Sequence, residues 1–180
     1  MDHTPAFPID FPGYTLRWLK PDDAGILQQL FDRCPDYAEI VEGEGVSPTA
    51  AEELFQSLPP GGSFSNKLVA GIFRRGGEIG GVLEGMKHYP EENIWWIGLL
   101  LLAPDMRNQG VGRTLLEAFI DFARGNAGKA VMLGVVEDNT RAYRFWSKNG
   151  FEMVRKTEPR LFGKKNQPVF VMRRKIEKKM

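Results

Sequence analysis

Apolar residues recur along the chain with spacings that predict alternating helices and strands. The segment Val111 to Arg124 carries apolar residues three or four positions apart, which is typical of an amphipathic helix. Asn93 to Leu102 and Ala130 to Val136 are instead almost continuously apolar, as strands are when both faces of a sheet are covered. A helix between two such strands favours a parallel pair joined by a crossover. The pattern predicts a mixed α/β sheet flanked by helices.

Weaker patterns give the remaining elements. We expect two helices near the N-terminus, the first with Asp22 as its N-cap, and a loop from Asp36 to Ser47 between them. Gly125 is expected to end the long helix in the left-handed conformation, and Arg75 to Gly77 to form a hairpin turn. The second N-terminal helix is expected to start at Ser47-Pro48, and a short helix is expected from Asn139 to Lys148. The other expected strands are Tyr14 to Leu19, Leu68 to Arg74, Glu78 to Lys87, Phe151 to Lys156 and Val169 to Arg174.

Length, charge and cysteine content narrow the class of protein. A chain of 180 residues suits one domain, residues 1–180, with an irregular proline-rich arm at 1–13. The formal net charge of +1 argues against nucleic-acid and membrane partners. With Cys34 as the one cysteine and no visible signal peptide, we expect a cytoplasmic protein without a disulfide. His3 and His88 lack neighbouring ligands, so no metal site is expected.

The segment Arg107 to Gly112 lies between a predicted strand and the long helix, and it contains Gly110. Glycine adopts positive φ and lets a ligand approach the backbone closely. The first N–H groups of a helix also favour anions, so the segment predicts a phosphate site, although a tight turn without a ligand would use the same glycines. A Walker A loop would need a lysine here, and a dinucleotide fingerprint would need glycine in place of Leu115.

Two motifs resemble those of the GNAT superfamily of N-acetyltransferases. Residues 107–112 read RNQGVG and match the family's Arg/Gln-x-x-Gly-x-Gly/Ala turn. Residues 139–151 read NTRAYRFWSKNGF and match Asn-x-x-Ala-x-x-x-Tyr-x-Lys-x-Gly-Phe, except that Trp146 stands at the tyrosine. The resemblance runs from about Tyr14 to Arg174, with the motifs confined to Leu99 to Phe151. It implies the GNAT acyl-CoA N-acyltransferase fold, a mixed central β-sheet flanked by helices, and acetyl-CoA as co-substrate.

The resemblance also implies how acetyl-CoA would be held. Backbone groups of Leu100 and Leu102 would pair with the pantetheine arm like an added strand. The glycine turn would hold the pyrophosphate, and the Asn139 amide would bond the pantetheine while also suiting a helix N-cap. Ala142 and Phe145 would pack beside the cofactor. The complete implied cofactor-binding set is Leu100, Leu102, Arg107, Asn108, Gln109, Gly110, Val111, Gly112, Arg113, Thr114, Asn139, Ala142, Phe145, Trp146 and Lys148.

The acid and base of the reaction are harder to assign, because the chain departs from the family at both positions. Trp146 replaces the tyrosine that often protonates the leaving thiolate, and an indole is no usable acid. Tyr143, one turn earlier, is the candidate donor, or else a packed aromatic residue. Relatives often carry the base on the central strand, where this chain has Gly98 and Leu99. Glu84 on the preceding strand is the candidate base with a raised pKa, or else a solvent-facing glutamate.

The resemblance implies an acetyl-CoA-dependent N-acetyltransferase that transfers acetyl directly to an amine of a small molecule or peptide, as a monomer or homodimer. Glu39, Glu42 and Glu44, in the expected loop beside the acceptor, would suit a cationic acceptor, or else are simply solvated. Trp95 and Trp96 point to opposite faces, so one belongs to the core and the other can line the acceptor pocket. A non-catalytic acyl-CoA-binding or sensing domain is the alternative, and a phosphate-binding module of another class is a third.

Overall fold

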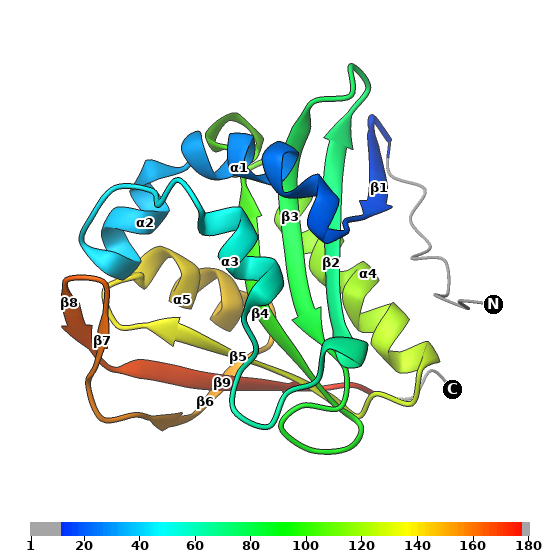
Figure 1. Cartoon of the computed structure of the whole chain (residues 1–180). Coiled ribbons are helices and arrows are strands. Elements are labelled where there is room, and N and C mark those ends of the chain that lie inside the picture. The colour runs from blue at the N-terminus through cyan, green and yellow to red at the C-terminus, as the bar shows by residue number, and fades with distance from the viewer. Residues whose placement is uncertain (1–11, 178–180) are drawn as a thin grey trace.

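The computed structural model describes residues 12–177, which form a seven-stranded mixed sheet with helices on both faces (Figure 1). Residues 1–11 of the expected N-terminal arm lie outside this range. Neighbouring strands pair antiparallel, except that β4 and β5 pair parallel, as the crossover pattern predicted. In sheet order the strands are β1 (Tyr14–Trp18), β2 (Lys67–Arg74), β3 (Ile79–Met86), β4 (Ile94–Leu102), β5 (Ala130–Val136), β9 (Val169–Lys175) and β6 (Glu152–Lys156).

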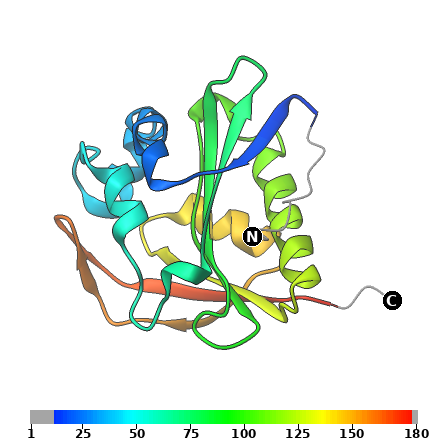
Figure 2. The ribbon, with the colours of Figure 1, turned by 45° about the vertical axis from the view of Figure 1, so that its right-hand side comes forward.

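Helices cover the sheet because each presents an apolar face to it. The helices are α1 (Ala24–Asp32), α2 (Pro35–Glu42), α3 (Ala50–Gln56), α4 (Val111–Gly125) and α5 (Thr140–Lys148), with short 3-10 turns at Pro21–Asp23, Phe64–Asn66 and Pro104–Met106. Figure 2 shows α1 and α3 on one side of the sheet and α4 on the other. Trp95 of β4 is fully buried against α4, with its ring centroid 5.6 Å from Phe119 and 5.5 Å from Phe122. The mixed sheet flanked by helices is therefore confirmed.

The N-terminal helices differ from the prediction in number and in their starts. The expected loop from Asp36 to Ser47 is wrong over its first half, because Pro35 occupies the first position of a further helix, α2, and fits its fixed φ. Asp22 is not the N-cap of α1, because a 3-10 turn precedes the helix and moves its cap to Asp23. The third helix starts at Ala50 rather than directly after Ser47.

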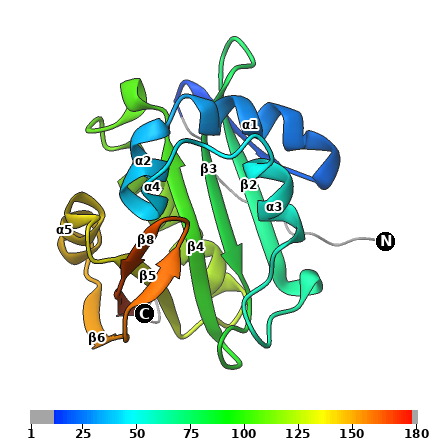
Figure 3. The same ribbon diagram turned by 60° about the vertical axis from the view of Figure 1, so that its left-hand side comes forward.

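The end of α4 and the C-terminal hairpin also differ from the prediction. Gly125 remains helical, and the positive φ falls at Ala127 (61°) instead. The Asn126 side chain donates a hydrogen bond to Phe122 O (2.8 Å), and the Gly128 N–H donates one to Ala123 O (2.7 Å), so carbonyls of the last turn are satisfied beyond Gly125. A separate hairpin of β7 (Arg160–Phe162) and β8 (Lys165–Gln167), not predicted from the sequence, lies beside α2 (Figure 3). Its strands are too short for an alternating pattern. No helix within residues 12–177 is long and apolar enough to cross a membrane.

Candidate active site

The candidate site lies where β4 and β5 separate. The two strands pair only over Ile94 to Ile97 of β4 and Ala130 to Leu133 of β5, although both continue further. A β-bulge at Gly98 coincides with the separation, because Ile97 and Leu99 oppose adjacent residues of β3. The central strand therefore loses its partner on one side and leaves a gap within the sheet.

Backbone groups of Leu100 and Leu102 face this gap. The Ala103 N–H bonds to β3 (2.8 Å), so the alternation of an antiparallel ladder directs the groups of Leu100 and Leu102 away from β3. The Leu102 carbonyl already accepts hydrogen bonds from Arg107 Nε (2.9 Å) and Cys34 Sγ (3.6 Å). The backbone of Leu100 and the N–H of Leu102 are therefore the groups able to pair with an extended ligand.

A cavity of about 900 Å³ runs along the gap between the glycine turn and α5. Most of the predicted cofactor-binding residues lie on its wall, namely Leu100, Leu102, Arg107, Asn108, Gly110, Gly112, Arg113, Asn139, Ala142, Phe145, Trp146 and Lys148. Three do not. Val111 is buried below it, Gln109 Nε2 donates to Asp105 O (2.6 Å), and the Thr114 hydroxyl donates to Gly110 O (3.1 Å). Val111 and Gln109 can therefore contribute backbone N–H groups, whereas the Thr114 N–H already donates to Gly110 O (3.0 Å).

The glycine turn has the backbone conformation that an anion cradle requires. Asn108 and Gly110 both adopt positive φ (60° and 80°), and α4 begins at the next residue, Val111. The first N–H groups of α4 have no partners within the helix and can donate to an anion. A Cβ on Gly112 would lie 3.4 Å from the Phe145 ring, in ordinary van der Waals contact, so the start of α4 lies close to α5. Basic residues on the cavity wall that the sequence did not single out add positive charge, namely Arg141, Arg155 and Arg160.

α5 supplies a polar cap and aromatic packing. Asn139 Oδ1 accepts a hydrogen bond from the Ala142 N–H (3.1 Å), so the side chain is the N-cap and its NH₂ group is left to donate into the cavity. Trp146 is buried in the core and also borders the cavity. Tyr143 packs against Phe170 instead, with ring centroids 5.2 Å apart, and within residues 12–177 it lies on the wall of neither this cavity nor the second one described below.

The guanidinium of Arg107 binds α2 and the end of β4 within the protein, so its hydrogen-bond donors are directed at these elements and not at the cavity. Its Nη atoms form two hydrogen bonds to the Asp36 carboxylate of α2 (2.6 and 3.1 Å), and its Nε donates to Leu102 O. Arg141 of α5 also donates to Asp36 (3.0 Å). The hydrogen bonds from Arg107, reinforced by Arg141, lower the pKa of Asp36 to about 2. Asp36, which the sequence analysis placed in a loop, thus ties α2 to Arg107 of the glycine turn and to Arg141 of α5.

Glu84 of β3 directs its carboxylate into the space beside the bulge. A Cβ on Gly98 would lie 2.0 Å from Glu84 Oε2, so the missing side chain at Gly98 makes room for the carboxylate. Lys67 Nζ lies 3.2 Å from Glu84 Oε1 and donates to Ser57 O at 2.9 Å. Burial raises the pKa of Glu84 above its ordinary value, and Lys67 offsets part of that effect. The expected burial and raised pKa are found, while the role as base stays a prediction.

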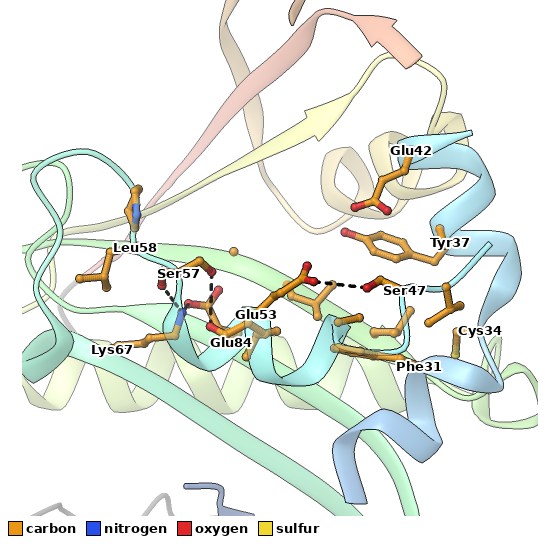
Figure 4. Close-up of a pocket in the computed structure, with 18 of the residues that line it drawn as sticks. Phe31, Cys34, Tyr37, Glu42, Ser47, Glu53, Ser57, Leu58, Lys67 and Glu84 are labelled. Atoms are coloured by element: carbon orange, nitrogen blue, oxygen red, sulfur yellow. Dashed lines mark hydrogen bonds and ion pairs between the residues drawn. The ribbon is translucent and has the colours of Figure 1, made fainter. Parts of the chain in front are cut away.

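A second cavity of about 470 Å³ lies between β4 and the helices α2 and α3 (Figure 4). It contains Glu84 and Lys67, and Trp96 lies on its wall while Trp95 is core, as the opposite-face argument predicted. Both cavities share the same residues where they meet, namely Tyr37, Pro59, Trp96, Gly98, Leu99 and Leu101. A ligand in the first cavity and a ligand in the second can therefore touch at the bulge. Within residues 12–177, no group of three or more His, Cys, Asp or Glu is placed to hold a metal ion.

Comparison with known proteins places this geometry in context. A model of the acetyltransferase (GNAT) family matches residues 27–151. An acetyltransferase from Thermus thermophilus is 23% identical, with a TM-score of 0.72 over 91% of this chain and 97% of that one. Spermidine N-acetyltransferase from Vibrio cholerae, solved with CoA and spermine, is 17% identical, with a TM-score of 0.70 over 92% and 97%.

A GNAT-family acetyltransferase from Streptococcus pneumoniae is 21% identical, with a TM-score of 0.66 over 91% of this chain and 99% of that one. These identities are too low to carry more than the fold. No curated protein matches the sequence. The family model thus supports the family, the solved structures support the fold, and the two comparisons agree.

Proposed function

Because the chain belongs to the acetyltransferase (GNAT) family, we propose that it transfers the acetyl group of acetyl-CoA directly to a primary amine of a small molecule or peptide. The observation that carries this proposal is the meeting of the two cavities at the bulge of β4, where this strand stops pairing with β5. One cavity has an anion cradle at a helix start, and the other has a buried carboxylate. Direct transfer requires two substrates to touch, and the shared wall allows that contact.

The larger cavity suits coenzyme A along its length. The backbone at Gly110 and the start of α4 would hold the pyrophosphate, with Arg113 and Lys148 supplying positive charge. The backbone of Leu100 would pair with the pantetheine arm, and the Asn139 NH₂ would donate to one of its carbonyls. Arg107 would act by positioning the turn, since its guanidinium is already bonded. The thioester would then lie at the bulge.

Glu84 would remove the proton from the amine. The neutral amine nitrogen attacks the acetyl carbon, a C–N bond forms and the C–S bond breaks, and the amine proton passes through water to the Glu84 carboxylate. A carboxylate with a raised pKa is a better proton acceptor than an exposed one. Backbone N–H groups of β4 beyond the bulge would donate to the developing oxyanion.

The departing thiolate needs no tyrosine acid in this proposal. Tyr143 packs on Phe170 away from both cavity walls, and Trp146 is a donor without a titratable proton. A thiol pKa of about 8.5 makes the thiolate a tolerable leaving group near neutral pH. Tyr143→Phe is therefore expected to keep most of the activity.

The experiment combines binding and transfer. Calorimetry should detect coenzyme A binding, and Gly110→Ala should weaken it about tenfold. An alanine at φ 80° costs roughly 1–2 kcal/mol, so the free turn would relax and binding would have to restore the strained conformation. The matched control is Gly76→Ala in the β2–β3 turn, where a Cβ would meet nothing within 4 Å. Thiol release from acetyl-CoA with a panel of primary amines then tests transfer. Binding without any thiol release would favour an acyl-CoA-binding domain, and no binding would contradict both functions.

A further inference from the structure

The three glutamates that the sequence offered for a cationic acceptor have different surroundings. Glu42, at the end of α2, lies on the wall of the smaller cavity. Glu39 is exposed and outside that wall, and Glu44 pairs with Lys164 at 3.5 Å. Among the described residues, Glu42 has no ion-pair partner. Burial and the nearby carboxylates of Glu44 and Glu53 raise the pKa of Glu42, as expected for a carboxylate without a cation.

Tyr37 lies beside Glu42 and adds an aromatic wall. Figure 4 shows the Tyr37 ring projecting from α2 into the cavity, with its hydroxyl next to the Glu42 side chain. Burial, together with Glu42 and Glu84, raises the pKa of Tyr37 to about 12, so the phenol stays neutral in a negative environment. A neutral phenol next to a carboxylate can accept a hydrogen bond from an ammonium group and place its ring against it.

The carboxylates of the cavity are not equivalent. Glu84 is compensated by Lys67 at 3.2 Å. Within the described part of the chain, Glu53 accepts only hydroxyl hydrogen bonds, from Ser47 (3.3 Å) and Thr49 (2.5 Å). Figure 4 shows the Glu84–Lys67 pair at one end of the cavity and Glu42 with Tyr37 at the other. Apolar side chains complete the walls, among them Phe31, Val46, Leu54, Leu99 and Leu101. Glu53 is exposed, so its charge is solvated, whereas Glu42 is partly buried. The partly buried carboxylate without a cation is therefore Glu42, at the end of the cavity away from Glu84.

We infer that the acceptor carries a second cationic group, several bonds from the amine that is acetylated, and that Glu42 and Tyr37 receive it. This inference rests on the proposed function, because it assigns the reacting amine to the Glu84 end of the same cavity. The apolar walls suit a hydrocarbon spacer between the two nitrogen atoms. A diamine fits this description, whereas an amine whose other end is neutral or anionic leaves Glu42 without a cation.

α2 is held in place before any acceptor binds. Asp36 fixes its first turn to Arg107, while the β7–β8 hairpin bonds its last carbonyls. Gln167 Nε2 donates to Val41 O (2.9 Å) and the Lys164 N–H donates to Glu42 O (2.7 Å). Gln167 is buried, at 4% exposed, so water competes little for its hydrogen bonds to α2. Glu42 and Tyr37 are thus preorganised, which lowers the entropy cost of selecting a cation.

The test compares butane-1,4-diamine with butan-1-amine, which have the same spacer and differ in the second nitrogen. We expect a kcat/KM at least about tenfold higher for the diamine, the factor that corresponds to about 1.4 kcal/mol from one partly buried charged contact. Glu42→Gln should lower the diamine value about tenfold and bring the ratio close to one. Tyr37→Phe should lower the ratio less, because the ring remains. Glu39→Gln on the same helix is the control and should leave both the ratio and the rates unchanged.

The outcomes separate the two proposals. Equal kcat/KM for the two amines in the unmodified protein, or a diamine preference that survives Glu42→Gln, overturns the second-cation inference while acetyl transfer stands. Absence of thiol release with every amine, at high protein and amine concentrations, overturns the acetyltransferase proposal and this inference with it. Thermal unfolding of each variant distinguishes a lost contact from a lost fold.

Discussion

Replacing Lys67 with methionine should move the acid limb of the pH–rate profile to higher pH. Lys67 Nζ lies 3.2 Å from Glu84 Oε1, and both side chains are largely buried. The ammonium group holds the pKa of Glu84 below the level that burial alone would set. Methionine keeps most of the aliphatic volume and removes the charge. Glu84 would then bind its proton more tightly, and a larger fraction of the protein would lack an ionised base at any given acidic pH.

The distance sets the size of the effect. At 3.2 Å, Coulomb's law gives about 1 kcal/mol in water-like surroundings and about 5 kcal/mol at an effective dielectric constant near 20. Because 1.36 kcal/mol corresponds to one pH unit and water can enter the vacated space, we expect the limb to move by about one pH unit or more.

Lys67→Met should also lower the free energy of unfolding, and more so at high pH than at low pH. The folded-state pKa of Glu84 lies above its ordinary value, so the folded protein binds this proton more tightly than the unfolded chain. Ionised Glu84 therefore destabilises the fold above the ordinary carboxyl range, and this cost disappears as the pH falls. Lys67→Met enlarges the cost, so its loss of unfolding free energy should be greater at pH 8 than at pH 5.

The assay is kcat/KM for thiol release from acetyl-CoA across pH 5 to 9, with urea denaturation at pH 5 and pH 8. Glu84→Gln should remove the acid limb and lower kcat/KM by roughly 10²–10⁴-fold, the usual contribution of general base catalysis. Lys175→Met, at an exposed position, is the control and should leave the limb in place. A limb that stays fixed in Lys67→Met, or one that persists in Glu84→Gln, would refute Glu84 as the base.

Two further predictions concern the bulge and α2. Gly98→Ala should displace the Glu84 carboxylate, since its Cβ would lie 2.0 Å from Oε2. The displaced atoms are the end of a flexible side chain, so the cost in urea denaturation should be modest, about 1 kcal/mol. In a Glu84→Ala background the same change should cost much less, and equal costs in the two backgrounds would contradict the close approach. Asp36→Asn should lower stability by about 1 kcal/mol at neutral pH, a modest value because Asp36 is 39% exposed. Since the pKa of Asp36 is lowered to about 2, this stabilisation should be present above the ordinary value of 3.8 and disappear as the pH falls toward 2, so a difference that grows on acidification would contradict the ion pair.

Periodicity was sufficient for the central part of the fold, because its signals are local. The apolar runs of β4 and β5 and the amphipathic stripe of α4 predicted a parallel pair with a crossover, which the structure confirms. Most residues of the two motifs lie on one cavity wall, since each motif sits at the start of a helix that follows a central strand. α2 and the β7–β8 hairpin escaped prediction because both are short and are stabilised by contacts with each other, such as Gln167 with the end of α2.

By itself the sequence determined the types of the longer elements, the crossover and the position of the glycine turn, since backbone conformation and apolar spacing depend on neighbours in the chain. It also singled out Glu84, but it could not connect that residue with Gly98, because the two meet only through the register of β3 and β4. Tertiary structure alone decided that Arg107 bonds Asp36, that Tyr143 packs on Phe170, and that Glu42 lies on the wall of the smaller cavity. The partner of a polar side chain depends on residues that are distant in sequence. The two motifs therefore predicted where the larger cavity lies, and tertiary packing decided which polar groups face it.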